Sequence, residues 1–384
     1  MTERHHRDSG VTRREALELL GASAGLALTT GCGENAPPDP ATPSPPSEAP
    51  ADIIFPENAV IRTILRDVAP ASLAGGATLF HEHLDLFQAY ASPPSDRGRG
   101  APPPTDEELK TFVALVTEEL RMAAADGMSC IVDAAIHRRS EQELGFVRQM
   151  ATDSGVAVVV AGSYWKAPYP EDVAMMSVEE WTDHMVTDAQ DQGWGAFGEV
   201  GTSMEMHDDE RRFLRAVSRA HQVTNLPIFT HTEHQGCRPC GLEQLSVFEE
   251  EGVDPRHLCI GHQSDITPEQ DPGWTTHLEI LGRGAYLGLD TVGRALALSS
   301  SPDVPEREKV RMVLSALDAG YEDQLLLSSD FASSVDLKSN WGSGLATTLV
   351  QFVPKLKHAG VDDATLRKIT VDNPRRFLAF VPPA

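Results

Sequence analysis

The stretch Leu79-Phe80-His81-Glu82-His83 joins a short apolar run to two histidines. Side chains two residues apart in an extended strand point to the same face, so His81 and His83 aim their imidazoles into one space. This spacing suits a metal ion, and a polar pair at a strand end is the alternative for the stretch taken alone. Residues further along the chain have to decide between these interpretations.

Short apolar runs alternate with amphipathic stretches from residue 77 onward, and such runs are typical of buried parallel strands. The predicted strands are residues 77–81, 129–135, 156–163, 195–200, 227–232, 258–262, 285–290 and 325–330. Helical patterns between them include residues 106–125, 177–189, 208–222, 305–319 and 345–359. Eight such units in roughly 310 residues favour an α/β fold of the (β/α)8 TIM-barrel type over an open doubly wound sheet. A hairpin or flap is expected at residues 53–76.

Metal-binding residue types end five of the predicted strands. They are His81 and His83 on the first strand, Glu199 on the fourth, His231 on the fifth, His262 on the sixth and Asp330 on the eighth. Active sites of TIM barrels lie at the C-terminal ends of the strands, so the six side chains are expected to converge on one mouth. Each residue alone also fits a cap, a core position or a turn, and their coincidence favours a metal centre.

Four imidazoles and two carboxylates suit Zn²⁺, with Mn²⁺ or Co²⁺ as alternatives, rather than an oxygen-only site for Ca²⁺ or Mg²⁺. We expect two divalent metal ions, bridged by a carboxylate placed between the histidine pairs. A water shared by both ions would react as hydroxide near neutral pH. Asp330 is the predicted catalytic residue, because its carboxylate can orient that hydroxide and transfer its proton.

The pattern resembles the phosphotriesterase family of the amidohydrolase superfamily. The resemblance extends from about Val60 to Phe380 and is carried by His81-Glu82-His83, Thr230-His231-Thr232, Ile260-Gly261-His262, residues 284–290 and Ser328-Ser329-Asp330. It implies that the two first-strand histidines and the last-strand aspartate hold a buried ion. It also implies that the fifth- and sixth-strand histidines hold a more exposed ion, with the fourth-strand carboxylate across both.

Many members of that family bridge the ions with a carboxylated lysine, whereas Glu199 stands at that position here. This substitution, residues 241–245 and the pair Asp290-Thr291 resemble the phosphotriesterase homology protein branch. Thr291 also replaces the arginine that is usual in the lactonase branch. The resemblance therefore implies a hydrolase acting on a carboxylic ester or amide of a small acidic or acylated compound.

Three other functions stay open at this point. A lactonase or phosphotriesterase is the alternative within the same class. A binding protein that retains the metal without turnover is the alternative from another class, and a metal-free structural barrel is the third. An intact Asp330 favours turnover over binding alone.

Two features near the expected mouth have competing interpretations. Tyr164, Trp165 and Lys166 follow the third strand and are predicted to line a substrate pocket, with packing at the barrel rim as the alternative. Cys237 and Cys240 form a C-x-x-C pair, which indicates either a disulfide or a redox pair. The loop at residues 84–104 is expected either to cover the mouth or to form a mobile surface loop.

Composition limits the partners of this 384-residue chain. A formal net charge of −25 argues against nucleic acid or an anionic membrane surface, because both attract basic proteins. Five cysteines are too few for a scaffold built from disulfides. A small-molecule substrate is therefore the expected partner. The formation of a homodimer stays open.

The N-terminus has the features of an export signal over residues 1–32. Thr12-Arg13-Arg14-Glu15-Ala16-Leu17 resembles a twin-arginine motif, and residues 21–30 form an apolar run too short to span a bilayer. Cys32 follows in a lipobox-like context and is a candidate lipidation site; an ordinary amphipathic helix is the alternative. Seven prolines in residues 33–52 predict an extended tether ahead of a hydrolase barrel at 53–384. A periplasmic or cell-envelope location is expected, with membrane attachment only through a lipid anchor.

Overall fold

The computed structural model describes residues 53–84, 105–134, 138–234, 236–294, 304–332 and 336–383. The chain divides into two compact units, Met1–Pro50 and Ala51–Ala384, and every described residue belongs to the second unit. The predicted export signal, lipidation site and tether lie outside the described residues, as do residues 85–104 of the predicted loop.

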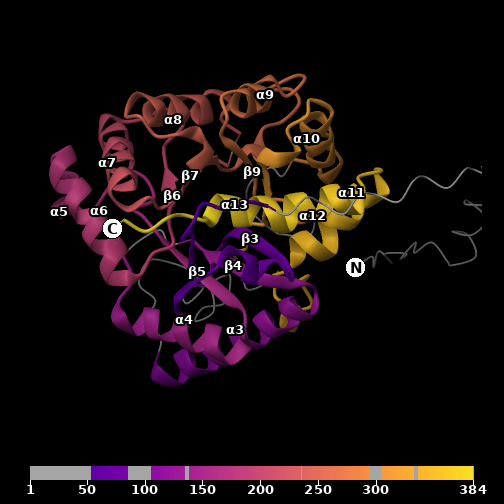
Figure 1. Cartoon of the computed structure of the whole chain (residues 1–384), viewed down its shortest axis with the longest axis horizontal. Coiled ribbons are helices and arrows are strands. Elements are labelled where there is room, and N and C mark those ends of the chain that lie inside the picture. The colour runs from indigo at the N-terminus through magenta and orange to yellow at the C-terminus, as the bar shows by residue number, and fades with distance from the viewer. Residues whose placement is uncertain are drawn as a thin grey trace, which may run out of the picture. The chain divides into compact units, whose positions relative to one another are not determined.

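Eight parallel strands form the centre of the folded unit, and helices surround them (Figure 1). The strands are β3 (Ala77–Glu82), β4 (Met128–Asp133), β5 (Ala157–Gly162), β6 (Ala196–Gly201), β7 (Ile228–His231), β8 (Leu258–Ile260), β9 (Tyr286–Leu289) and β10 (Leu325–Leu327). Each strand pairs in parallel with the next one along the chain, as Val132 does with Val159. The observed strands coincide with the predicted ones apart from their ends.

The first and last strands meet and close the sheet into a barrel. The backbone N–H of Asp330 donates to the carbonyl of His81 at 3.1 Å, and the N–H of His83 donates to the carbonyl of Phe331 at 3.0 Å. The buried Glu82 carboxylate crosses the same seam and accepts hydrogen bonds from the backbone N–H groups of Ser329 (2.9 Å) and Phe331 (2.6 Å). The predicted (β/α)8 barrel is therefore confirmed.

Replacement of Glu82 by alanine should destabilise the closed barrel. The change leaves the buried N–H groups of Ser329 and Phe331 and the hydroxyl of Ser328 without their acceptor. Each unsatisfied buried donor costs about 1–3 kcal/mol, so we expect the free energy of unfolding to fall by at least about 3 kcal/mol. Urea unfolding of the wild type, Glu82→Ala and Glu82→Gln measures this, and glutamine should cost less because it keeps one acceptor. If the free energy of unfolding of the alanine variant fell by less than about 1 kcal/mol, the role of Glu82 in closing the barrel would be contradicted.

The helices that follow the strands differ in how they begin. They are α3 (Asp106–Ala125), α4 (Glu141–Ser154), α5 (Glu171–Ala174), α6 (Val178–Gln192), α7 (Asp208–Thr224), α8 (Arg238–Glu250), α9 (Thr275–Gly282) and α10 (Glu306–Asp318). Thr105, Ser140 and Ser177 cap α3, α4 and α6, and a glutamate three residues later accepts a hydrogen bond from the N–H of each cap. These caps fix where each helix begins after its connecting loop.

The C-terminal part differs from the single helix predicted at residues 345–359. A π-helical turn at Thr348–Phe352 precedes α11 (Val353–His358), and a second π-helical turn, Lys368–Asp372, joins α12 (Asp363–Arg367) to α13 (Asn373–Leu378). Short 3₁₀ turns lie at Pro70–Leu73, Pro255–His257, Gln263–Asp265, Glu322–Gln324 and Lys338–Asn340. None of the described helices combines the length and apolar character needed to cross a bilayer.

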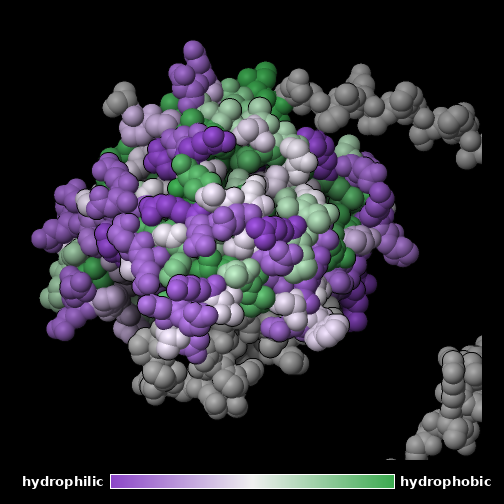
Figure 2. Space-filling model, turned by 90° about the horizontal axis from the view of Figure 1, so that it is seen from below, coloured by the Kyte–Doolittle hydropathy of each residue, from purple (hydrophilic) through white to green (hydrophobic). Residues whose placement is uncertain are grey.

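Alternate residues of the strands build two apolar layers. In β5, Val158 and Val160 pack in the layer between sheet and helices, whereas Val159 and Ala161 belong to the cluster that fills the barrel interior. The face in Figure 2 is mostly hydrophilic, with hydrophobic residues scattered among the polar ones. Both faces of each strand are therefore buried, which explains the continuous apolar runs in the sequence.

The first and last described segments of the folded unit close the N-terminal end of the barrel. The predicted hairpin is present as β1 (Ile61–Arg62) and β2 (Asp67–Val68), which pair antiparallel. Ile61 and Phe377 of α13 both belong to the interior cluster, and Val60 forms a bridge with Phe380. This apolar closure leaves the opposite, C-terminal end of the strands for polar side chains.

Candidate metal centre

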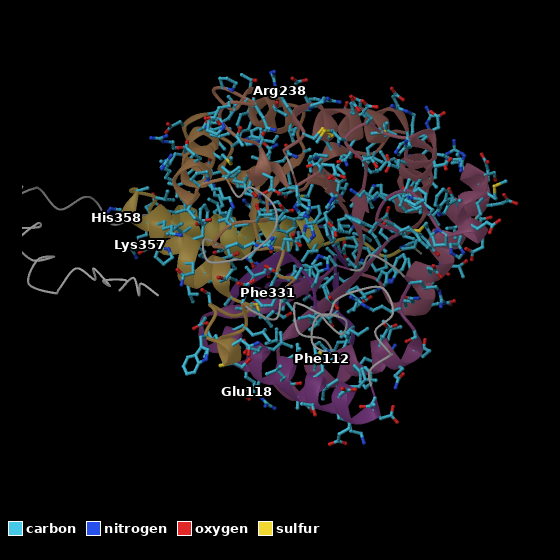
Figure 3. The ribbon with its side chains drawn as sticks, turned by 180° about the vertical axis from the view of Figure 1, so that it is seen from behind. Phe112, Glu118, Arg238, Phe331, Lys357 and His358 are labelled. Atoms are coloured by element: carbon cyan, nitrogen blue, oxygen red, sulfur yellow. A yellow bond between two sulfur atoms is a disulfide. The ribbon has the colours of Figure 1, made fainter. Side chains whose placement is uncertain are left out.

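The six predicted side chains lie together at the C-terminal end of the barrel. β3 carries His81 and is followed by His83; β6 carries Glu199; β7 ends in His231; His262 follows β8 and Asp330 follows β10. All of them are buried. Figure 3 places Phe331, the neighbour of Asp330, near the middle of the ribbon, whereas Arg238 at the start of α8 lies at its edge.

The first group of potential ligands comprises His81, His83 and Asp330. Nε2 of His83 lies 3.0 Å from Oδ1 of Asp330, and Nε2 of His81 lies 3.9 Å from the same oxygen. One nitrogen or oxygen atom from each residue falls within 4.8 Å of the other two. Two imidazoles and one carboxylate therefore surround a single point.

The second group comprises His231 and His262, and Glu199 lies between the two groups. Nδ1 of His231 is 2.7 Å from Nε2 of His262, and Oε2 of Glu199 is 2.9 Å and 3.5 Å from these nitrogens. The other oxygen, Oε1, is 3.7 Å from Nε2 of His83. Oε2 also lies 3.2 Å from Nε2 of His81, so the Glu199 carboxylate contacts both groups, as a bridging carboxylate requires.

One of these contacts fits a shared cation better than a hydrogen bond between the side chains. Nε2 of His81 is only 3.2 Å from Oε2 of Glu199, yet this buried nitrogen has no aligned hydrogen-bond partner among the described residues. A short contact without hydrogen-bond alignment is expected when the two atoms are ligands of a common ion. Nδ1 of His231 and Nε2 of His262, by contrast, form a hydrogen bond of 2.7 Å. The donor set of nitrogen and carboxylate oxygen matches Zn²⁺ and related metals.

The electrostatics around His81 and His83 favour positive charge, whereas burial lowers the pKa of His231 to about 4. Burial lowers the pKa of His81, but Glu199 and Asp290 outweigh it and raise this pKa to about 10. Burial likewise opposes a charge on His83, but Asp330 raises its pKa to about 9. The pKa of Glu199 falls well below its usual range because the attraction of His231 and His81 outweighs burial. A cluster that draws protons onto buried imidazoles also attracts a metal cation.

The backbone φ angle is positive at two of the six positions. His262 has φ of 54° and Asp330 has φ of 47°, values that L-residues adopt rarely and that cluster at functional sites. Gly261 lets β8 approach β7, since a Cβ there would lie 2.0 Å from the carbonyl oxygen of Thr230. Only glycine at position 261 allows this close approach of the two strands, which sets the position of His262.

Asp290 is a site residue whose role was not predicted from the sequence. It follows β9, and its Oδ2 lies 2.9 Å from Nδ1 of His81. Its Oδ1 lies 3.0 Å from Nδ1 of His262 and accepts the backbone N–H of that residue at 2.8 Å. One carboxylate thus orients one imidazole of each group, and its place at the end of the predicted seventh strand was the available signal.

Arg294 is a second residue that the sequence did not identify. Its Nη1 donates to Oδ2 of Asp330 at 3.2 Å, and its side chain is largely buried. The other oxygen of Asp330 faces His83. Arg294 therefore fixes the rotation of the carboxylate that is predicted to transfer the proton.

The three predicted pocket residues separate in the structure. Tyr164 packs on Trp181 and Phe213, and its hydroxyl pairs with His184 of α6 at 2.9 Å. These are the contacts of the packing alternative. Trp165 instead lies edge-on to His231, with ring centroids 5.1 Å apart, and Lys166 lies over the Trp165 ring and pairs with Glu233. Trp165 and Lys166 thus lie beside the candidate metal-binding cluster, whereas Tyr164 packs among aromatic rings; the pocket role of the three residues stays a prediction.

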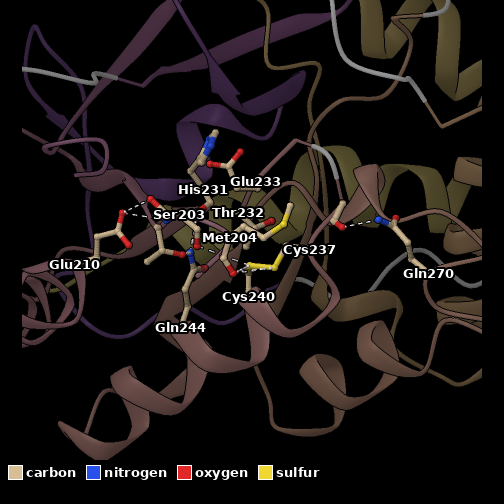
Figure 4. Close-up of a disulfide and its surroundings, with 12 residues drawn as sticks. Ser203, Met204, Glu210, His231, Thr232, Glu233, Cys237, Cys240, Gln244 and Gln270 are labelled. Carbon is tan, nitrogen blue, oxygen red and sulfur yellow. Dashed lines mark hydrogen bonds between the residues drawn. A yellow bond between two sulfur atoms is a disulfide. The ribbon is translucent and has the colours of Figure 1, made fainter. Parts of the chain in front are cut away.

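Cys237 and Cys240 form a disulfide at the start of α8 (Figure 4). Gln244 of the same helix donates to the carbonyl of His231 at 2.7 Å and to the hydroxyl of Thr202 at 2.8 Å. The disulfide thus links two residues at the start of α8, the helix whose Gln244 holds the backbone of His231. Of the two interpretations of the C-x-x-C pair, the structure contains the disulfide.

Comparisons with known proteins agree with this geometry. A family model described as the phosphotriesterase family matches residues 60–378. The N-acetyltaurine hydrolase of Tetraodon nigroviridis is 27% identical over 350 residues, which cover 83% of this chain and 98% of the relative. The phosphotriesterase homology protein of Escherichia coli is 28% identical over 311 residues, covering 79% and 97%.

A solved structure shares both sequence and fold with this chain. A resiniferatoxin-binding protein from Rhodobacter sphaeroides is 30% identical and gives a TM-score of 0.69 over 83% of this chain and 94% of that one. The family model covers nearly all of the barrel, and the relatives match over almost their full lengths. The chain therefore belongs to the phosphotriesterase family of hydrolases.

Proposed function

We propose that this chain is a binuclear, zinc-type hydrolase that cleaves the amide or ester bond of a small acylated compound carrying an acidic group. The observation that carries the proposal is the placement of Glu199 between two sets of ligands, with one oxygen toward His83 and the other toward His231. His81, His83 and Asp330 would hold one cation, and His231 and His262 the other.

Each of the residues around the cluster has its own role in the proposed hydrolysis. Two divalent cations, when bound, acidify water and polarise a substrate carbonyl. Asp330 accepts the proton of the attacking water and returns it to the leaving nitrogen or oxygen as the acyl bond breaks. Arg294 holds the Asp330 carboxylate in place for both transfers. Asp290 keeps His81 and His262 in the orientation in which they bind metal.

The acidic group of the substrate is inferred from a relative and from one side chain. The Tetraodon relative is named an N-acetyltaurine hydrolase, and its substrate is an acetamide with a sulfonate at the other end. Lys166 supplies a cation near His231, above the Trp165 ring at 4.5 Å, and is now neutralised by Glu233. A substrate sulfonate or carboxylate would compete with Glu233 for the Lys166 ammonium.

Substitution of Lys166 by methionine should weaken the binding of acidic substrates selectively. A hydrogen bond to a charged group contributes about 1.5–3 kcal/mol, so KM for an N-acyl amino acid or N-acyl aminosulfonate should rise about ten- to a hundredfold with little change in kcat. Lys166→Arg, which keeps the charge, and a neutral ester substrate are the controls. Equal effects of Lys166→Met on acidic and neutral substrates would contradict this role.

A substrate panel on metal-loaded protein tests the bond class. N-acyl aminosulfonates, N-acyl amino acids, aryl esters, lactones and paraoxon separate the alternatives, and we expect turnover of the acidic amides to be fastest. Preferred hydrolysis of lactones or of paraoxon would instead support the lactonase or phosphotriesterase alternative.

Binding without turnover is the second candidate function, favoured by one observation. The Rhodobacter sphaeroides relative is described as a resiniferatoxin-binding protein. The ordered contacts of Asp330 with His83 and Arg294 support turnover in this chain, since binding alone does not need a positioned carboxylate. Metal-loaded protein that leaves every compound of the panel intact would favour the binding function.

A further inference from the structure

His234 lies beside the second ligand group, in the segment between β7 and α8. Its ring centroid is 4.3 Å from that of His262 and 4.9 Å from that of His231. One ligand atom from each of these three histidines lies within 4.8 Å of the other two. The spacing resembles that of the first group, yet His234 was not among the residues considered from the sequence.

A buried carboxylate orients the His234 ring. Nδ1 of His234 lies 3.1 Å from Oδ2 of Asp265, and Oδ1 of Asp265 accepts the Thr291 hydroxyl at 2.5 Å. Ser264 in turn pairs with the same hydroxyl at 2.7 Å. A histidine whose Nδ1–H donates to a carboxylate carries its lone pair on Nε2, and this arrangement is typical of metal-bound imidazoles.

The two candidate cation sites are unequal without His234. The first would have four protein ligands, His81, His83, Asp330 and the shared Glu199. The second would have only three, His231, His262 and Glu199. Structural sites have four protein donors and catalytic ones three plus a water, with expansion to five donors, so the second site can accept His234 as a further ligand and would then match the first.

We propose that His234 is the additional protein ligand of the second cation, so that three imidazoles and Glu199 hold it. The proposal rests on the proposed two-metal function and adds a residue to it. Asp265 acts as the positioning residue, in the same way that Asp290 orients His81 and His262. Figure 4 labels His231, Glu233 and the two cysteines of the disulfide, and His234 lies in the sequence between Glu233 and Cys237.

Metal binding by His234→Ala and His234→Gln tests the proposal without relying on activity. Each protein is loaded with Co²⁺, its metal content is determined, and the affinity of the second equivalent is measured by competition with a chelator. Loss of an outer hydrogen bond to a ligand typically costs 10–100-fold in affinity, so we expect both variants to lose at least about tenfold at the second site. The visible absorption of the second Co²⁺ should change as well, because one nitrogen donor is lost. His358→Ala, at the exposed end of α11 (Figure 3), is the matched control and should match the wild type.

The outcomes separate the two proposals. Wild-type protein with two Co²⁺ ions, and His234 variants with weakened second-site binding and an altered spectrum, would support the ligand assignment. Two ions in the wild type and in both variants, with the same affinity and spectrum, would overturn the assignment while leaving the proposed function intact. Wild-type protein that takes up no cation would overturn both.

Discussion

Asp330→Asn should reduce turnover by about a thousandfold while the protein stays folded and keeps at least one metal ion. The carboxylate has two separate contacts, Oδ1 with His83 at 3.0 Å and Oδ2 with Arg294 at 3.2 Å. Asparagine keeps the shape and one oxygen for a cation, but its amide cannot accept the proton of the attacking water. The loss should therefore appear in kcat measured per metal ion bound, with the best substrate of the panel.

Two comparisons make this result specific. Asp318→Asn removes a carboxylate from the exposed end of α10 and should leave turnover unchanged. Metal content determined on the same samples separates loss of proton transfer from loss of the cation. Turnover within about tenfold of the wild type in Asp330→Asn, at equal metal content, would remove the residue from the proton-transfer role.

Glu199→Ala should lower the metal content from two equivalents to at most one. The side chain provides one oxygen toward His83 and one toward His231 and His262, so its removal takes a ligand from both sites at once. It also removes a buried negative charge that helps to hold the two cations close together. Metal analysis after exhaustive dialysis against metal-free buffer measures the change.

A substitution of the same kind elsewhere provides the control for Glu199. Glu205→Ala lies in the loop after β6, where the side chain is exposed, and should retain both ions. Glu199→Gln separates the charge from the shape, and we expect it to bind the second ion more weakly than the wild type. Two full equivalents in Glu199→Ala would contradict the bridging role.

The barrel was predictable because its signal is local. Strands buried on both faces have to be apolar throughout, as Val158-Val159-Val160 is, and the helices between them follow the 3.6-residue period. The ends of such strands must meet at one rim, so the six side chains could be grouped without coordinates. Closure of the barrel through Glu82 was not foreseen, because this carboxylate meets its partners 247 and 249 residues away.

The residues that the sequence did not reveal depend on long-range pairing or on loop conformation. Asp290 meets His81 across 209 positions, and Arg294 meets Asp330 across 36. His234 lies in a loop, where no periodicity fixes the direction of a side chain. Such contacts form only when the barrel closes, so they cannot be predicted from the residues that are adjacent in the sequence.

The substrate pocket predicted at Tyr164, Trp165 and Lys166 stays a prediction. Tyr164 and Trp165 follow β5 (Ala157–Gly162), and their side chains reach different neighbours. Tyr164 joins the aromatic packing on α6, and Trp165 faces His231. The export signal, the lipid anchor at Cys32 and the oligomeric state stay predictions, since the described residues do not include the first two.

Anomalous diffraction from metal-loaded crystals is the most direct test of the account. If Glu199 bridges two divalent cations, the map should show two peaks about 3.5–4 Å apart, one beside His81 and His83 and the other beside His231 and His262. A single peak, peaks distant from Glu199, or no peak in the barrel mouth would contradict the binuclear centre on which the proposed hydrolysis depends.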